Sequence, residues 1–441
     1  MKYEERLQNV TILGAAGKMG SGIVLLTAIE MADLKLKPEN KEINYVLNAL
    51  DLSKEALVGL LSYLKTQLTK QAEKKIELLK PLFSNATEDA QIIEQYVNFV
   101  LEIVNPITEI EIAYKSTIIF EVASENPDLK VKLFSQINQN NKNKPWFLTN
   151  TSSIPIHILN EKANLEGRIV GCHFYNPPAI QKLVEVIAAD KTLPDLVDFT
   201  VTFAKKLRKI VVPSNDIAGF IGNGHFLRDV LYATSEVERL RKNMSLHEAI
   251  YVVNKVSQEY LVRPMGIFQL CDYVGIDVCQ YILKVMDTNI ANENLNSELL
   301  NSMISVGVKG GQNADGSQKD GFMQYEKGRP VSIYNYETKS YIAVSEIKEK
   351  CDTYLGSMPT ALAIWKVVIA SPEKDDLLNA HFNEIKYMQT EGAKMALNYG
   401  KRAVEIGKKL VSNCVAKTEQ DVNTVMLTGF FHAYGPINNY F

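Results

Sequence analysis

A glycine-rich turn close to the N-terminus constrains the fold of this chain most strongly. Residues 10–13 form a short apolar run, which is typical of a strand buried on both faces of a sheet. Gly14, Gly17 and Gly20 follow, and residues 23–29 have a helical pattern. Glycines at this spacing let the backbone approach a pyrophosphate, and the helix N-terminus offers N–H groups and the positive end of its dipole. The pattern predicts a dinucleotide-binding unit, with a tight turn that binds nothing as the alternative.

Further short apolar runs alternate with helical segments through the first half of the chain. Strands are predicted at residues 45–47, 117–122, 146–148, 169–172, 184–187 and 210–212. This alternation predicts an α/β fold of Rossmann type with a mostly parallel, doubly wound sheet. Residues 35–42 have the character of an inserted loop, and residues 81–114 give no clear pattern.

The pattern changes after Pro213, because nearly all of the remaining chain is helical in character. We therefore predict an all-α C-terminal part and three domains: a nucleotide-binding domain at 1–213, a helical domain at 214–345 and a second helical domain at 346–441. A glycine-rich, polar stretch at 310–316 predicts an exposed loop between helices.

Two segments of the helical part resemble each other weakly. Residues 253–268 and residues 422–437 each combine a helical stretch with a glycine turn and an adjacent proline. The domain at 346–441 is therefore either a duplicate of the one before it or similar to it by chance.

A helix is predicted after Ser53, with Asp51 just before it. Leu57, Leu61, Leu64 and Leu68 would lie on one helix face, and lysines that include Lys70 would form a solvated opposite side. Asp51 ends the predicted second strand, where a carboxylate accepts hydrogen bonds from the adenine ribose and repels a 2′-phosphate. That position favours NAD over NADP. The alternative is that Asp51 only caps the helix, a role that Ser53 could also fill.

A histidine and a glutamate on neighbouring predicted strands form the candidate catalytic pair. Glu185 stands in the middle of an apolar strand, where a carboxylate is costly unless it is paired, and His173 ends the preceding strand. Oxidation of an alcohol by hydride transfer needs a base, and histidine side chains titrate near neutral pH. A carboxylate behind such a base fixes its tautomer and stabilises the imidazolium.

Composition excludes several other classes of protein. The 441 residues carry 48 basic and 51 acidic side chains, which leaves no electrostatic footprint for nucleic acid. Five widely spaced cysteines argue against a disulfide framework and against a structural zinc site, so we expect no metal. The N-terminus lacks a signal-peptide pattern and no apolar run is long enough to span a membrane, so a cytoplasmic protein is expected.

Around the candidate pair the sequence resembles the 3-hydroxyacyl-CoA dehydrogenases. Residues 171–187 are similar to that family's signature, in which H-F-F-N-P precedes K-L-V-E-V. Other resemblances follow in the family's order. They are E-N-L-x-L-K at residues 125–130, N-T-S-S at 150–153, G-F-I-x-N at 219–223, P-M-G-P at 264–267 and K-G-F-Y near residues 320–322. The resemblance covers about residues 8–330, and the whole chain resembles the dehydrogenase portion of multifunctional fatty-acid oxidation enzymes without their hydratase domain.

The resemblance implies a role for each matching residue. His173 would be the general base and Glu185 its orienting carboxylate, with Ser152 and Asn223 bonding the reacting oxygen or the thioester region. The residues implied in cofactor binding are Gly14, Gly17, Met19, Gly20, Asp51, Glu125, Lys130, Asn150 and Asn176. Lys70 would meet the phosphates of CoA. The helical domain of shorter members forms a dimer interface, so a homodimer is expected unless a second copy of that domain occupies the surface.

Departures from the family pattern leave alternatives open. Ala15 replaces the first glycine of the usual G-x-G-x-M-G loop, and Ile267 replaces the second proline of P-M-G-P. The main hypothesis is NAD-dependent oxidation of an (S)-3-hydroxyacyl-CoA to the 3-ketoacyl-CoA. The alternatives are a dehydrogenase of a free hydroxy acid or sugar acid, and a dinucleotide-binding relative without catalysis.

Overall fold

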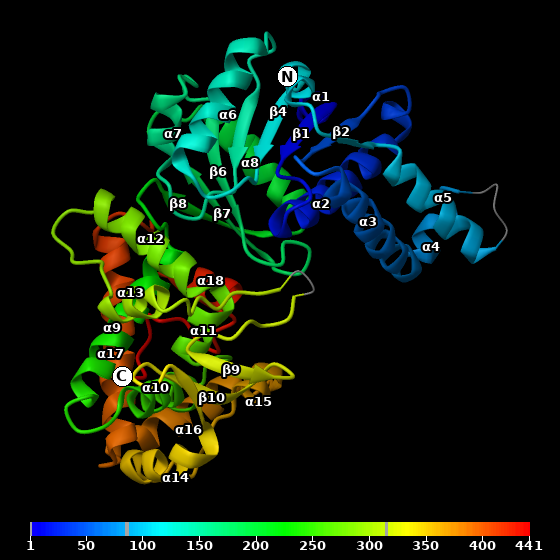
Figure 1. The fold of residues 1–441 in the computed structure, drawn as a ribbon. Helices are drawn as coiled ribbons and strands as arrows, with labels where there is room; N and C mark the ends of the chain where they lie inside the picture. Colours follow the sequence, from blue (N-terminus) through cyan, green and yellow to red (C-terminus); the bar gives the residue numbers. More distant parts are fainter. Residues whose placement is uncertain (1, 84–87, 314–315) are drawn as a thin grey trace. The chain divides into compact units, whose positions relative to one another are not determined.

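The computed structural model describes residues 2–83, 88–313 and 316–441 and divides the chain into two compact units (Figure 1). Unit 1 comprises Met1–Asp216 and unit 2 comprises Ile217–Phe441. Parts of two predicted segments, at 84–87 and 314–315, lie outside the described residues. No helix in the described part of the chain is both long and apolar enough to cross a membrane.

Unit 1 is built around an eight-stranded sheet in the order β3-β2-β1-β4-β5-β6-β7-β8. The strands are β1 (Asn9–Leu13), β2 (Val46–Leu50), β3 (Val104–Ile107), β4 (Ile118–Glu121), β5 (Trp146–Thr149), β6 (Ile169–Phe174), β7 (Leu183–Ala188) and β8 (Ile210–Asn215). Neighbouring strands are parallel except at β6–β7, which are antiparallel, so β7 and β8 run against the rest. The predicted α/β Rossmann-type sheet is confirmed.

Helices cover both faces of this sheet (Figure 1). They are α1 (Tyr3–Arg6), α2 (Lys18–Lys35), α3 (Lys54–Lys74), α4 (Ile76–Leu79), α5 (Asp89–Leu101), α6 (Pro127–Asn140), α7 (Ile156–Lys162) and α8 (Pro194–Lys206). Alternate strand residues such as Ile12 and Phe174 pack with α2, α3, α5 and α8. The opposite face packs on α6 and α7, as in the edge-to-face pair Phe134–Phe147 at 5.3 Å.

Several local predictions for unit 1 need correction. Strand β3 was not predicted; it is a half-exposed edge strand that contains Pro106, and proline is tolerated only at sheet edges or bulges. The stretch at 35–42 is partly ordered, since α2 runs to Lys35 and a 3-10 turn follows at Pro38–Asn40. On α3 the buried stripe includes Leu60, whereas Leu61 is only half-buried.

Unit 2 is mostly helical. Its helices are α9 (Gly222–Leu240), α10 (Leu246–Lys255), α11 (Ile267–Val274), α12 (Ile276–Asn289), α13 (Glu298–Ser305), α14 (Val344–Leu355), α15 (Trp365–Ala370), α16 (Lys374–Tyr387), α17 (Glu391–Ser412) and α18 (Glu419–Gly429), and a π-helical turn at Val256–Tyr260 follows α10. The sequence did not predict its three-stranded antiparallel sheet, which consists of β9 (Met323–Glu326), β10 (Arg329–Asn335) and β11 (Ser340–Ala343).

The two similar segments of unit 2 make matching backbone contacts. Asn254 Oδ1 accepts the N–H of Phe268 at 3.1 Å, and Asn423 Oδ1 accepts the N–H of Ile437 at 3.0 Å. Both pairs are separated by 14 residues. These contacts support the proposed duplication of the helical domain, which remains a prediction.

Candidate active site

The glycine loop joins β1 to α2 and depends on two of its glycines. Gly14 has a φ of +80°, and a Cβ there would lie 2.7 Å from the Val122 carbonyl oxygen. A Cβ on Gly20 would fall on the Gly14 carbonyl oxygen, so α2 could not pack this closely against the loop with any side chain at that position. Gly17 is the N-cap of α2 and leaves the helix start without a side chain over it. This is the cradle that a pyrophosphate requires.

Asp51 lies beside this loop, as predicted from the sequence. One of its carboxylate oxygens accepts the N–H of Ala16 at 2.9 Å, and the other accepts the N–H of Leu52 at 2.8 Å. Asp51 is therefore not the cap of α3, because Ser53 accepts the N–H of Ala56 at 3.1 Å and fills that role. The carboxylate stands at the carboxyl end of β2, next to the cradle, where a dinucleotide's ribose would be recognised.

The candidate catalytic pair sits on the antiparallel strands β6 and β7. His173 and Glu185 are cross-strand partners in the register of these strands. The His173 Nδ1 and Glu185 Oε1 atoms are 3.2 Å apart. Glu185 is fully buried and His173 is 7% exposed, so the carboxylate lies behind the imidazole and away from solvent.

A buried network connects the predicted cofactor residues Glu125 and Lys130 to the turn at 150–153. The Lys130 ammonium lies 2.7 Å from Glu121 and 3.2 Å from Glu125. Glu125 in turn accepts hydrogen bonds from the hydroxyl of Thr151 and the backbone N–H of Ser152. Burial alone would raise the pKa of Glu125, but the Lys130 charge and these hydrogen bonds bring it below its ordinary value. In this network Lys130 is 1% exposed, and its contact with the cofactor stays a prediction.

The turn at 150–153 is tied to the strand that carries the histidine. Asn150 Oδ1 accepts the N–H of Phe174 at 2.8 Å, which fixes the turn against the end of β6. Asn176 belongs to the loop that follows, and that loop packs on α2, where a Cβ on Gly22 would lie 3.1 Å from Pro178. The candidate pair, the turn and the start of α2 are thus held together within unit 1.

Two predicted residues belong to other elements of the chain. Lys70 is on the exposed side of α3, and Asn223 belongs to unit 2, in the first turn of α9. Gly219 leads into α9 with a φ of +83°, and a Cβ there would lie 2.6 Å from the Met286 sulfur, which explains the glycine at this position.

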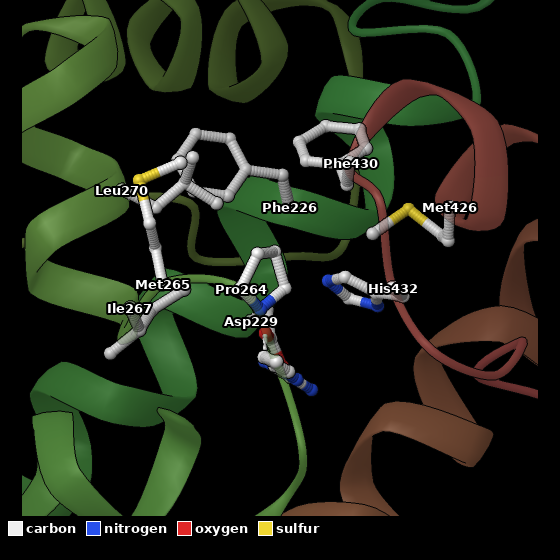
Figure 2. A pocket seen from close by; sticks show the side chains of 10 residues that line it. Phe226, Asp229, Pro264, Met265, Ile267, Leu270, Met426, Phe430 and His432 are labelled. Atoms are coloured by element: carbon white, nitrogen blue, oxygen red, sulfur yellow. Dashed lines mark hydrogen bonds and ion pairs between the residues drawn. The ribbon is translucent and has the colours of Figure 1, made fainter. Parts of the chain in front are cut away.

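Unit 2 encloses a small cavity between α9, the turn before α11 and the segment after α18 (Figure 2). Its lining includes apolar side chains such as Phe226 and Phe430 and the polar side chains of Asp229, Arg263 and His432. Its volume is about 20 Å³, enough for about one water molecule. This cavity is too small to hold a substrate.

Sequence reasoning missed two side chains at the site. Glu121, at the end of β4, pairs with Lys130 and accepts the hydroxyl of Thr149 at 2.6 Å. Tyr175 donates its phenolic O–H to Glu185 at 2.7 Å. A carboxylate directly after the apolar residues 118–120 was a signal for Glu121, whereas Tyr175 becomes visible only once the register of β6 and β7 is known.

Comparison with known proteins gives consistent matches along the chain. Residues 9–217 match a family model described as 3-hydroxyacyl-CoA dehydrogenase, NAD binding domain, and residues 246–320 match the C-terminal domain of the same family. A probable 3-hydroxyacyl-CoA dehydrogenase of Caenorhabditis elegans is 30% identical over 317 residues, which cover 71% of this chain and 93% of that relative. A probable 3-hydroxybutyryl-CoA dehydrogenase of Bacillus subtilis is 27% identical over 320 residues, which cover 72% of this chain and 97% of that relative.

A solved structure extends the likeness to the rest of the chain. The crystal structure of 3-hydroxybutyryl-CoA dehydrogenase from Escherichia coli matches with a TM-score of 0.64 at 19% identity. The match covers 98% of this chain and 90% of that one. At this identity it shows a shared fold, which includes the part of unit 2 that the family models leave unmatched.

Proposed function

The chain belongs to the 3-hydroxyacyl-CoA dehydrogenase family, and on this premise we propose that it transfers a hydride reversibly between an (S)-3-hydroxyacyl-CoA and NAD in fatty-acid metabolism. The product of the oxidation is the 3-ketoacyl-CoA. The observation that carries the proposal is the pair of His173 and Glu185, with 3.2 Å between Nδ1 and Oε1, in the family's NAD-binding domain.

The pair has the arrangement that alcohol oxidation requires. Because Nδ1 of His173 faces Glu185, proton transfer with the substrate hydroxyl would use Nε2. The buried carboxylate would hold the ring in the tautomer with the proton on Nδ1 and stabilise the imidazolium that forms. A base positioned in this way contributes about 10²- to 10⁴-fold to the rate.

The residues of the glycine loop fit a dinucleotide, since the close approach of the loop backbone to the start of α2 leaves no room for a side chain at Gly20. We propose that Gly14, Gly17, Met19 and Gly20 bind the pyrophosphate of NAD and that Asp51 bonds the adenine ribose. NAD, when bound, supplies the hydride acceptor. A carboxylate at this position would repel the 2′-phosphate of NADP, so we expect a preference for NAD.

The remaining assignments concern the substrate, the support of the cofactor and the location of the protein. Ser152 and Asn223 would bond the reacting oxygen or the thioester region, Asn176 would lie between nicotinamide and substrate, and Lys70 would meet the phosphates of CoA. Glu125, Lys130 and Asn150 would support the cofactor through the buried network. A cytoplasmic location is also part of this proposal.

A spectrophotometric assay of NADH oxidation tests the proposal. Acetoacetyl-CoA with NADH should react rapidly, NADPH should react much more slowly, and free acetoacetate should not react. Reaction with free acetoacetate at a comparable rate would instead favour a dehydrogenase of free acids. Absence of any reaction, together with normal NADH binding, would favour a binding protein without catalysis.

A further inference from the structure

The carboxylate of Glu185 contacts two side chains at the end of β6, one on the strand and one directly after it. Tyr175 lies two residues after His173, so the two side chains leave β6 and its extension in similar directions. The Tyr175 phenol donates to Glu185 Oε1 at 2.7 Å, and His173 Nδ1 lies 3.2 Å from the same oxygen. The phenol and imidazole rings also pack on each other, with centroids 4.8 Å apart and an interplanar angle of 40°.

This arrangement depends on the phenolic oxygen. The family signature has phenylalanine at the position of Tyr175, so the hydrogen bond distinguishes this chain from the family pattern. Burial and the neighbouring Glu185 charge keep the pKa of the Tyr175 phenol well above its usual range. The phenol therefore stays protonated and acts as a donor toward the carboxylate.

We propose that Tyr175 is a positioning residue for the reaction: it anchors Glu185 Oε1 in line with Nδ1 of His173, and its ring limits rotation of the imidazole. The carboxylate of a glutamate can rotate about its last side-chain bond, and a second donor on the same oxygen restricts that motion. His173 is thereby held with its proton on Nδ1 and with Nε2 as the proton-accepting atom. The role in catalysis rests on the proposed function, but the anchoring itself does not.

The test compares Tyr175→Phe with a matched control. Phenylalanine keeps the ring and removes only the donor, and it is the residue that the family signature has at this position. Tyr3→Phe is the control, because Tyr3 also donates its hydroxyl to a glutamate of unit 1, Glu30, at 3.1 Å. The first readout is the ¹⁵N NMR shift pair of the His173 ring in protein labelled at its histidines, with His173→Gln used to assign the signal.

The His173 shifts show whether Tyr175 anchors the carboxylate of Glu185. In Tyr175→Phe we expect the His173 shifts to move from those of a single Nδ1–H tautomer toward the average of two tautomers, with no change in Tyr3→Phe. Identical His173 shifts in Tyr175→Phe and the unmodified protein would overturn the proposal. This readout requires no turnover, so it remains decisive even if the proposed function fails.

Kinetics then test the role in the reaction. With acetoacetyl-CoA and NADH, Tyr175→Phe should lower kcat by about 3- to 10-fold with little change in KM, the effect of one ordinary hydrogen bond. A tautomer change without a fall in kcat would confine Tyr175 to a structural role and reject the positioning function. An unmodified protein that lacks activity would refute the proposed function while leaving the anchoring result intact.

Discussion

His173 is the residue at which a single substitution should affect the chemical step most and cofactor binding least. Removal of the imidazole in His173→Ala eliminates the proposed base, so kcat should fall by about 10²- to 10⁴-fold. NADH affinity should stay nearly unchanged, because the glycine loop and Asp51 are untouched. His247→Ala is a suitable control, since this histidine lies in the first turn of α10 in unit 2. Full activity of His173→Ala would reject the assignment.

Gly20 tests the cofactor cradle separately from the chemistry. A methyl group there would collide with the backbone of Gly14 and Ala15, so the loop must move. We expect Gly20→Ala to weaken NADH binding at least tenfold and to destabilise the fold by about 1–3 kcal/mol. Fluorescence titration with NADH and thermal unfolding measure the two effects.

Gly59 provides the matched control for that substitution. It lies on the exposed side of α3, and a Cβ there would meet no atom within 4 Å. Gly59→Ala should leave NADH affinity unchanged and raise stability by about 0.5–1 kcal/mol, because alanine favours a helix over glycine. If both variants bound NADH normally, the cradle would not be the cofactor site.

The residues of the site differ in how visible they are in the sequence. Glu185 could be predicted because a carboxylate inside an apolar strand needs a partner, and the glycines because their spacing matches a known backbone turn. Tyr175 carries no such signal, because its partner is defined only by the pairing of β6 with β7. Long-range register, not local pattern, decides which side chains meet.

Whether a strand could be predicted from the sequence depended on how deeply it is buried. The strands of the sheet other than β3 are largely apolar runs and were predicted. Strand β3 lies at the sheet edge with alternating exposure, and β9 to β11 are short strands that are partly exposed. Their sequences lack a continuous apolar run, so periodicity alone could not distinguish them from loops.

Asn254 and Asn423 allow a test of whether the two similar segments of unit 2 are structurally equivalent. Asn254 accepts the N–H groups of both Phe268 and Gln269, and it is 6% exposed. Asn423 accepts one N–H and donates to the Ile437 carbonyl at 2.9 Å. We expect Asn254→Ala and Asn423→Ala each to lower the free energy of unfolding by about 1–3 kcal/mol, with the larger loss at the more buried Asn254. Urea unfolding measures both changes. If either substitution left the free energy of unfolding unchanged, the two asparagines would not have equivalent structural roles.

A buried histidine, His225, lies where helices α9 and α17 meet. Its burial predicts that the fold loses stability at acid pH. Burial lowers the pKa of His225 to about 4, although Asp229 acts in the opposite direction. Between the ordinary value of 6.5 and about 4, the unfolded chain binds a proton at this position that the folded chain does not. The free energy of unfolding should therefore fall as the pH falls through this range, by up to about 1.4 kcal/mol per pH unit.

His225→Gln should remove the part of this pH dependence that His225 contributes. Urea unfolding at several pH values within the range gives the slope for each protein. His432 also has a pKa held well below its ordinary value by burial, so a smaller slope should remain in the variant. Equal slopes for the variant and the unmodified protein would mean that His225 is not the group that titrates.

At the scale of the whole molecule, the face of α9 that looks toward α17 is covered from within the same chain. His225 Nε2 is 3.2 Å from the Ala403 carbonyl oxygen, and the Tyr399 hydroxyl donates to the Asp229 carbonyl at 3.3 Å. Lys409 of α17 and Arg228 of α9 both pair with Glu293. The part of α9 that α17 covers is not accessible to a second chain, and we therefore predict a monomer; the homodimer that the family resemblance implies is the alternative.

Dependence of stability on protein concentration separates these two states. A dimer that forms through α9 would gain stability as concentration rises, whereas an intrachain contact would not. We expect sedimentation to show one species over a wide concentration range and Tm to be independent of concentration. Tyr399→Ala, which removes a side chain that is 1% exposed at this contact, should lower stability by about 3–5 kcal/mol equally at low and high concentration. If raising the concentration restored the Tm of this variant, the helices would be meeting between chains, and the C-terminal domain would not be acting as an internal partner.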